Sequence, residues 1–118
     1  MSANLEQLSD RLFVLRVRGE VKKTELDAVQ SEIVAKMTAR PVQLLVILKN
    51  FMGWERTQEW GDMDFFLSHQ DDFGKIAVVG HPVWEAQVLA FMGAGFRKGP
   101  VKFFPETSEQ DARAWLAE

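Results

Sequence analysis

Two uninterrupted apolar runs constrain the fold of this chain more than any other feature. Leu44–Leu48 and Ile76–Val79 contain no polar residue and are bounded by polar residues or glycine. Runs of this kind are typical of strands that are buried on both faces, as in the middle of a parallel sheet. A parallel pair needs a long crossover connection, which is usually helical. The segment Glu55–His69 between the two runs is therefore predicted to be a helix.

The N-terminal part predicts an antiparallel hairpin at the edge of this sheet. Residues 11–18 alternate between an apolar face and an arginine face, formed by Phe13, Leu15 and Val17 and by Arg16 and Arg18. This alternation indicates a strand that is buried on one side, with the arginines on the wetter face. Leu5 and Leu8 precede a polar Ser9-Asp10 turn and predict a short first strand that pairs with it.

Three further segments show helical or strand patterns. Between Lys22 and Ala39, apolar residues at helical spacing predict an amphipathic helix that Pro41 closes; they are Leu26, Val29, Ile33 and Met37. Another helix is predicted from Pro82 to the glycines Gly93 and Gly95, because proline suits a first helical position and glycine suits a helix end. Val101–Phe104 predicts a strand. Thr107 and Ser108 offer caps for a last helix that turns Ala112, Trp115 and Leu116 inward.

These elements predict an α/β fold. Its sheet is mainly parallel, with four to five strands, an antiparallel N-terminal edge hairpin and about four helices. The 118 residues, 47% of them apolar, suit one domain that spans residues 1–118. The net charge of −3 argues against nucleic acid as a partner, because phosphate binding needs a concentrated basic surface. The absence of cysteine excludes thiolate chemistry, and no apolar run reaches the length of a membrane span, so we expect a cytoplasmic protein.

An ordered set of landmarks resembles the SpoIIAA-like family. The landmarks are Phe51-x-Gly53-Trp54, Trp60-x-Asp62, His69, Ile76–Gly80, Trp84-Glu85, Val101–Phe104 and Ala112-x-x-Trp115-Leu116. The resemblance spans nearly the whole chain and implies a single STAS-like domain. The STAS superfamily comprises sulfate-transporter and anti-sigma-factor-antagonist domains, and this family is often related to CRAL-TRIO lipid-binding proteins. The resemblance to this family implies apolar ligand binding and membrane association.

The chain departs from the family pattern at two positions. Lys22 stands where members usually carry a Ser or Thr cap, which costs about 1 kcal/mol of helix capping unless Thr24 takes over. His81 stands where an Asp or Asn often follows the glycine, so a role that needs a carboxylate at that position is in doubt. Neither departure threatens the fold.

The loop Asn50–Trp54 emerges where ligands favour open parallel sheets, at the carboxyl ends of the strands, together with Gly80–Trp84 and Pro105–Ser108. A phosphorylation switch of the anti-sigma-antagonist type is not expected, because this loop has no Ser or Thr. Thr57, the nearest hydroxyl, lies inside the predicted helix, where a surface role is favoured.

The candidate polar residues do not form a catalytic group. Asp62 and His69 share a helix face but lie two turns apart, so they are not expected to bond directly. We favour partly buried polar groups satisfied by backbone, and the alternative is that they orient a polar head group. No metal site is expected from His69 and His81, whose spacing fits no recognised pattern, and no cofactor fingerprint is present.

The glycine-rich segment Gly93–Gly99 is interpreted as a helix end and not as a phosphate loop, because it follows a helix. Within it, Arg97 and Lys98 are expected to lie in a solvated surface turn, with contact to an anionic head group as the alternative.

The predicted helix 82–92 is the most suggestive element, because only Glu85 and Gln87 are polar between Pro82 and Gly93. Burial on both sides, by a neighbouring helix or a second subunit, is one explanation; a lid or membrane-facing helix is the other.

The leading hypothesis is a non-enzymatic module that holds a small apolar or lipid-like ligand, with reversible membrane contact. The alternative is an interaction module or homodimer that uses helix 82–92. The candidate ligand-binding residues are Phe51, Trp54, Asp62, Phe66, His69, His81, Trp84, Val88, Phe91 and Met92.

Overall fold

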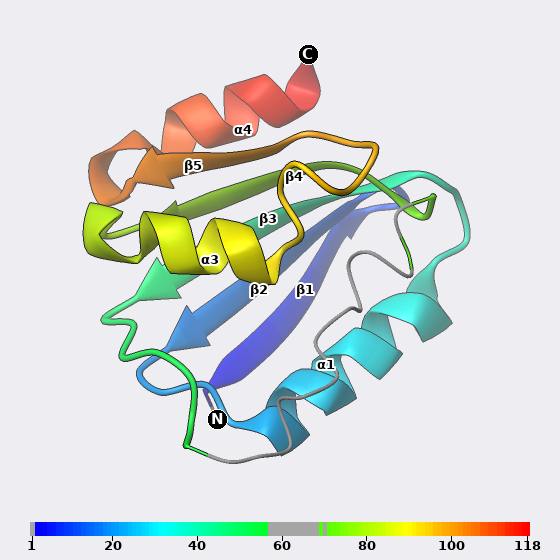
Figure 1. Cartoon of the computed structure of the whole chain (residues 1–118). Coiled ribbons are helices and arrows are strands. Elements are labelled where there is room, and N and C mark those ends of the chain that lie inside the picture. The colour runs from blue at the N-terminus through cyan, green and yellow to red at the C-terminus, as the bar shows by residue number, and fades with distance from the viewer. Residues whose placement is uncertain (1, 57–68, 70) are drawn as a thin grey trace.

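The computed structural model describes residues 2–56, 69 and 71–118, which contain one five-stranded sheet in the order β1-β2-β3-β4-β5 (Figure 1). The strands are β1 (Ala3–Ser9), β2 (Leu12–Arg18), β3 (Val42–Lys49), β4 (Phe73–Gly80) and β5 (Val101–Pro105). β1 pairs with β2 in the antiparallel direction, and all other neighbours are parallel. The predicted α/β fold, with a mainly parallel sheet and an antiparallel N-terminal edge, is confirmed.

The two apolar runs lie side by side in the middle of the sheet, as their composition predicts. Leu44 pairs with Ile76 and Ile47 with Val79. Leu44, Leu45, Ile76 and Ala77 have no exposed surface. Burial on both faces requires a layer of side chains on each side of the sheet.

Helices cover both faces. α1 (Lys23–Lys36) and α3 (Glu85–Phe91) lie on one face, and α4 (Glu109–Ala117) lies on the other (Figure 1). The described residues thus contain three α-helices, whereas about four were predicted. The remaining predicted helix, Glu55–His69, falls almost wholly on residues 57–68, outside the described part of the chain.

The core is divided by the sheet into two clusters. The larger one joins α1 and α3 to the sheet face that carries Phe13, Leu15 and Val17. The smaller one packs Ala112 and Leu116 of α4 against the opposite face. The helix stripe of Leu26, Val29, Ile33 and Met37 is buried as predicted. The exposed Arg16 and Arg18 lie on the α4 side of the sheet, toward the β1 edge.

Two predicted helix starts differ in detail. The segment that begins at Pro82 first makes a 3-10 turn, η2 (Pro82–Trp84), and α3 itself begins only at Glu85. Before α4, η3 (Glu106–Ser108) takes the chain into the helix, and neither Thr107 nor Ser108 makes the predicted capping bond. A cap needs extended backbone, and Ser108 has φ −117° and ψ 30°.

The start of α1 is capped from a distance. The side chain of Lys22, the N-cap residue, makes no capping bond, as expected for lysine in place of Ser or Thr. Thr24 does not take over this role. Instead, the amide of Lys23 donates to Oε1 of Glu55 at 2.7 Å. A carboxylate at this position also complements the positive end of the helix dipole. The residue that caps α1 therefore comes from the loop after β3, 32 positions along the chain.

The glycine-rich segment ends α3 as predicted. Gly93 has φ +78°, and its amide donates to the carbonyl of Ala90, while the amide of Ala94 donates to that of Leu89. These two bonds form a Schellman motif, in which a left-handed glycine satisfies the last helical carbonyls.

The interpretation of Arg97 as part of a solvated turn is wrong. Its residue is only 7% exposed, and its guanidinium donates to the carbonyls of Phe73 at 2.7 Å and Gly74 at 3.0 Å. β5 pairs with β4 only from Ile76 onward, so the first carbonyls of β4 take this side chain as a partner. Burial lowers the pKa of Arg97. Arg97 is therefore used in the fold and is not available to an anionic ligand.

Candidate functional site

Three loops emerge at the carboxyl edge of the sheet, as predicted, because β3, β4 and β5 run in parallel (Figure 1). The loop after β3 is fixed by the segment after β2. The amide of Met52 donates to the carbonyl of Gly19, and that of Val21 donates to the carbonyl of Gly53, both at 2.9 Å. The loop is thus anchored by backbone bonds on the side of α1.

Four aromatic side chains meet beside this loop, and we call them the aromatic cluster: Phe51, Trp54, Trp84 and Phe91. The ring of Phe51 meets those of Trp54 and Trp84 edge to face, with centroids 5.3 and 4.9 Å apart. Trp54 also contacts Trp84 at 6.3 Å and Phe91 at 5.4 Å. Edge-to-face pairs are favourable because the positive ring edge faces the negative ring face. The cluster ties the loop after β3 to η2 and α3.

Gly53 allows this packing. It has φ +91°, and a Cβ built on it would lie 3.1 Å from Cη2 of Trp84. Any other residue would be strained in its backbone and would push the indole ring away.

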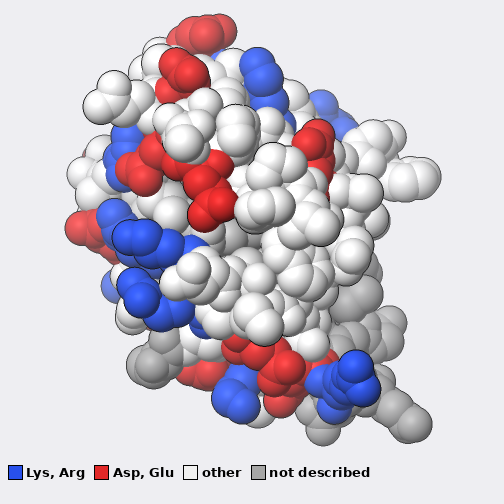
Figure 2. All heavy atoms as spheres, turned by 90° about the vertical axis from the view of Figure 1, so that its left-hand side faces the viewer, with Lys and Arg blue, Asp and Glu red and all other residues white. Residues whose placement is uncertain are grey.

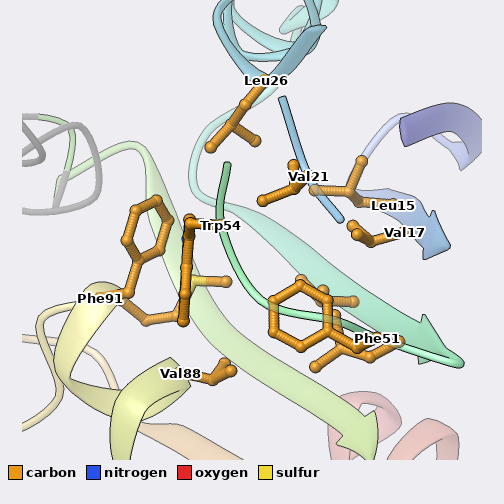
Figure 3. Close-up of a pocket in the computed structure, with 11 residues that line it drawn as sticks. Leu15, Val17, Val21, Leu26, Phe51, Trp54, Val88 and Phe91 are labelled. Carbon is orange, nitrogen blue, oxygen red and sulfur yellow. The ribbon is translucent and has the colours of Figure 1, made fainter. Parts of the chain in front are cut away.

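An apolar pocket lies next to the aromatic cluster, on the sheet face that α1 and α3 cover (Figure 3). Five of its lining residues are predicted candidates, namely Phe51, Trp54, Val88, Phe91 and Met92. The other six come from β2, the segment after it, α1 and β3; they are Leu15, Val17, Val21, Leu26, Val46 and Leu48. Figure 3 shows Phe91 and Trp54 on one side of the pocket and Leu15 and Val17 on the other. No lining residue is polar.

The pocket is small. Its volume of about 30 Å³ exceeds the space that one water molecule needs but falls far below the 300–1,000 Å³ that is usual for small-molecule sites. Because a buried water needs polar partners and the walls offer none, the pocket suits apolar atoms. A ligand longer than a few carbon atoms requires side chains of the wall to move.

Five of the six lining residues that were not proposed as ligand contacts were predicted only as buried, namely Leu15, Val17, Leu26, Val46 and Leu48, and Val21 was not predicted as part of the core. The alternation in residues 11–18 placed Leu15 and Val17 on the buried face, and helical spacing did the same for Leu26. Periodicity identifies a buried face but does not tell a packed position from the wall of a pocket.

Trp84 lies beside the pocket and does not line it. It belongs to the aromatic cluster, where it packs against Phe51 and over Gly53. Its predicted role as a ligand contact stays a prediction. Two other candidates, Asp62 and Phe66, lie outside the described residues, as does Thr57.

His81 caps η2. Its Nδ1 accepts a hydrogen bond from the amide of Val83 at 3.1 Å, which is the part that an Asp or Asn side chain plays at such a position. The departure from the family pattern thus preserves a cap. His81 does not line the apolar pocket.

His69 lies apart from the pocket, next to Asp72. Its Nδ1 is 3.0 Å from Oδ2 of Asp72, whose other oxygen accepts from Nε of Arg40 at 2.9 Å. The hydrogen bond from His69 and the charge of Arg40 outweigh burial and lower the pKa of Asp72. His69 thus has a side-chain partner, where the sequence analysis favoured the backbone. It does not join the aromatic cluster.

The outward face of α3 remains exposed. Val83 is 67% exposed, and Ala86 and Ala90 are also on the surface, while Val88 and Met92 point into the core. Met52, at the tip of the neighbouring loop, is 69% exposed. Figure 2 shows this edge of the molecule, with uncharged residues at and to the right of its centre and Lys and Arg on the left, near the top and at the bottom. Within the described residues no neighbouring helix buries this face, and its burial by a second subunit stays a prediction.

Within residues 2–56, 69 and 71–118, no three His, Cys, Asp or Glu side chains are grouped so that they could hold a metal ion. None of the helices described is both long and apolar enough to cross a membrane.

Comparisons with known proteins bear on the fold. A family model described as SpoIIAA-like matches residues 12–117. A solved structure, that of an uncharacterized protein of the DUF3478 family with a SpoIIAA-like fold from Shewanella loihica PV-4, is similar with a TM-score of 0.69 and 19% identity. The similarity covers 97% of this chain and 91% of that one, and at this identity it shows the fold alone. Among curated proteins nothing matches. Lipid binding and the relation to CRAL-TRIO proteins gain no support from these comparisons.

Proposed function

The chain belongs to the SpoIIAA-like family, and we propose that it is a non-enzymatic binding module that holds the apolar part of a small amphipathic ligand between α3 and the sheet. The observation that carries this proposal is the pocket with eleven lining residues, all of them apolar, near the carboxyl edge of a parallel sheet. Ligands favour this edge in open α/β sheets. The sequence contains no cysteine, no ordered Ser-His-Asp set that is typical of a catalytic triad and no cofactor fingerprint. These features favour a role in binding over one in catalysis.

The small volume sets the way a ligand enters. α3 is seven residues long and Val88 is its one buried residue, so moving it away from the sheet uncovers Val88 and breaks the contact of Phe91 with Trp54. The half-buried rings of Trp54 and Phe91 would then line a longer groove. The aromatic cluster would hold the ligand chain, and the polar end of the ligand would stay in water.

Reversible membrane contact is part of the same proposal. Met52 and Val83 expose most of their apolar surface at the loops next to the pocket. Exposed apolar side chains at one edge are typical of proteins that dip into a bilayer interface. Such contact would let an amphipathic ligand pass between the bilayer and the pocket.

The test uses two matched substitutions. Val88→Met fills the pocket, whereas Val83→Met makes the same change on the exposed side of η2. Dodecanoate is titrated into each variant, with intrinsic tryptophan fluorescence and calorimetry as readouts. We expect Val88→Met to weaken binding at least tenfold and Val83→Met to leave it within twofold of wild type.

Two further measurements are decisive. Purified protein is denatured and extracted, and the extract is examined by mass spectrometry for lipid. Separately, the protein is sedimented with phosphatidylcholine vesicles. The proposal is refuted if no lipid co-purifies, dodecanoate does not bind and vesicles do not carry the protein down.

The alternative function is an interaction module or homodimer that uses the outward face of α3. The exposed Val83, Ala86 and Ala90 favour it, because a partner would cover this apolar strip. Sedimentation equilibrium would then show association that Ala86→Arg abolishes. A mass that equals one chain at every concentration would exclude the homodimer.

A further inference from the structure

A second hollow lies on the opposite face of the sheet, where α4 does not extend over β1 and β2. Its volume is about 430 Å³, within the range of small-molecule sites. Asn4, Arg16, Arg18 and Lys49 line it from the strands, and Glu109 lines it from the start of α4. We call it the basic groove.

The sheet register gathers the positive charges of the groove. Arg18 pairs with Lys49 across β2 and β3, and Arg16 stands two residues before Arg18 on the same face. Neighbouring strands are about 4.8 Å apart, and residues two apart on a strand about 7 Å. The three cationic side chains therefore start within reach of one small ligand.

Two of these charges have no ion-pair partner among the described residues. Arg16 is paired with Glu6 at 2.7 Å, and the carboxylate of Glu109 is held by Arg113 at 3.0 Å. Within the described residues, Arg18 and Lys49 form no ion pair. Like charges opposite each other on adjacent strands destabilise a sheet, and here they persist in a chain of net charge −3.

We propose that the basic groove binds a small phosphate monoester. Two unpaired positive charges match a phosphate monoester, which carries a charge of about −1.5 to −2, better than a single carboxylate. The arginine fork suits bidentate contact with phosphate oxygens, and the lysine adds a point charge. Asn4, on the neighbouring edge strand, adds an amide donor.

The basic groove shares one lining residue, Val17, with the apolar pocket, but the two open on opposite faces of the sheet. Leu15 and Val46 face the pocket, whereas Arg16 and Ile47, the next residue on each strand, face the groove. Failure of the proposed apolar site would leave this inference standing.

The experiment compares two double variants of equal charge. Arg18→Gln/Lys49→Gln removes both unpaired charges, and Arg11→Gln/Lys36→Gln removes one arginine and one lysine that do not line the groove. Glycerol 3-phosphate is titrated into each protein by calorimetry. We expect the groove variant to bind at least about tenfold more weakly than wild type, and the control to stay within about twofold.

A second probe separates the two sources of the phosphate. Vesicles that contain phosphatidic acid are compared with vesicles of phosphatidylcholine. Binding to glycerol 3-phosphate supports a free metabolite, and binding to phosphatidic acid vesicles alone supports a lipid head group; each requires loss in the groove variant. The inference is overturned if neither probe binds, or if both double variants lose binding equally.

Melting temperatures guard against misfolding. The groove variant without ligand should melt at or above wild type, because repulsion between Arg18 and Lys49 is gone. Glycerol 3-phosphate should raise the melting temperature of wild type and control but not of the groove variant. If the double variant does not fold, Lys49→Gln alone should still bind glycerol 3-phosphate more weakly than wild type, by a smaller factor. An unchanged affinity in this single variant would overturn the inference.

Discussion

Replacing Phe51 by leucine is expected to lower the free energy of unfolding by about 2–4 kcal/mol. Phe51 is 9% exposed, and its ring makes two edge-to-face contacts, with Trp54 and with Trp84. Each aromatic pair contributes about 0.5–1.5 kcal/mol beyond the buried area, so losing two costs about 1–3 kcal/mol. The smaller leucine adds about 1 kcal/mol of lost burial.

The chain supplies a matched control. Phe96 carries the same side chain but is 83% exposed, so Phe96→Leu should change the free energy of unfolding by less than about 0.5 kcal/mol. Urea denaturation of both variants, followed by circular dichroism, measures the difference. In thermal melts, the Phe51 variant should lose roughly 8–16 °C, at about 4 °C per kcal/mol for a domain of this size.

The aromatic cluster, and not merely burial of apolar area, is the source of most of this expected loss. If Phe51→Leu falls within 0.5 kcal/mol of Phe96→Leu, the cluster does not hold the loop after β3 to α3. A changed urea slope together with a small loss would point instead to an altered unfolded state.

Further predictions concern the backbone and two polar groups around the site. Gly53→Ala should lower the free energy of unfolding by roughly 1–3 kcal/mol in urea denaturation, because φ is +91° and the new Cβ would stand 3.1 Å from an indole carbon. Gly19→Ala is the control, with φ +67° and no atom within 4 Å of the new Cβ, and it should lose only roughly 1–2 kcal/mol through backbone strain. The hydrogen bond from His69 lowers the pKa of Asp72, so the ionised Asp72 side chain stabilises the fold. This stabilisation is complete above the unfolded pKa of about 3.9 and is lost as the pH falls through the lower pKa of the folded state. Between pH 6 and pH 2.5, Asp72→Asn should therefore lose less stability than wild type, and equal losses would contradict this linkage. His81→Ala should lower the free energy of unfolding by about 0.5–1 kcal/mol, measured in urea denaturation, whereas His81→Asn should retain the cap. An equal loss in both variants would contradict the capping role.

Some parts of the fold follow from local patterns alone. The apolar runs of β3 and β4, the alternation in β2 and the stripe of α1 each state which face is buried, because side-chain periodicity is a property of the chain itself. The glycine-ended α3 follows for the same reason, since the left-handed Gly93 closes the helix with its nearest carbonyls. The antiparallel pairing of β1 with β2 also follows from the short connection between them.

Other features depend on partners that are distant in sequence. Glu55 caps α1, Arg97 satisfies the first carbonyls of β4, and the predicted caps at Thr107 and Ser108 are not used. In the first two cases a polar side chain bonds a backbone N–H or C=O group that has no partner in its own helix or strand. Several side chains of the chain have the chemistry to form such a bond, so the sequence does not show which one does. The same holds for Asp72, whose side chain is a partner of His69.

By itself, the sequence determined the class of fold, the buried faces and the carboxyl edge as the place where the aromatic residues gather. Only the tertiary structure decided that Trp84 lies beside the pocket, that the pocket is small with apolar lining residues, and that Arg18 and Lys49 stand side by side and form no ion pair among the described residues. Periodicity fixes the direction of each side chain relative to its own strand or helix. The shape and charge of a site depend on packing and register between segments, which no local pattern encodes.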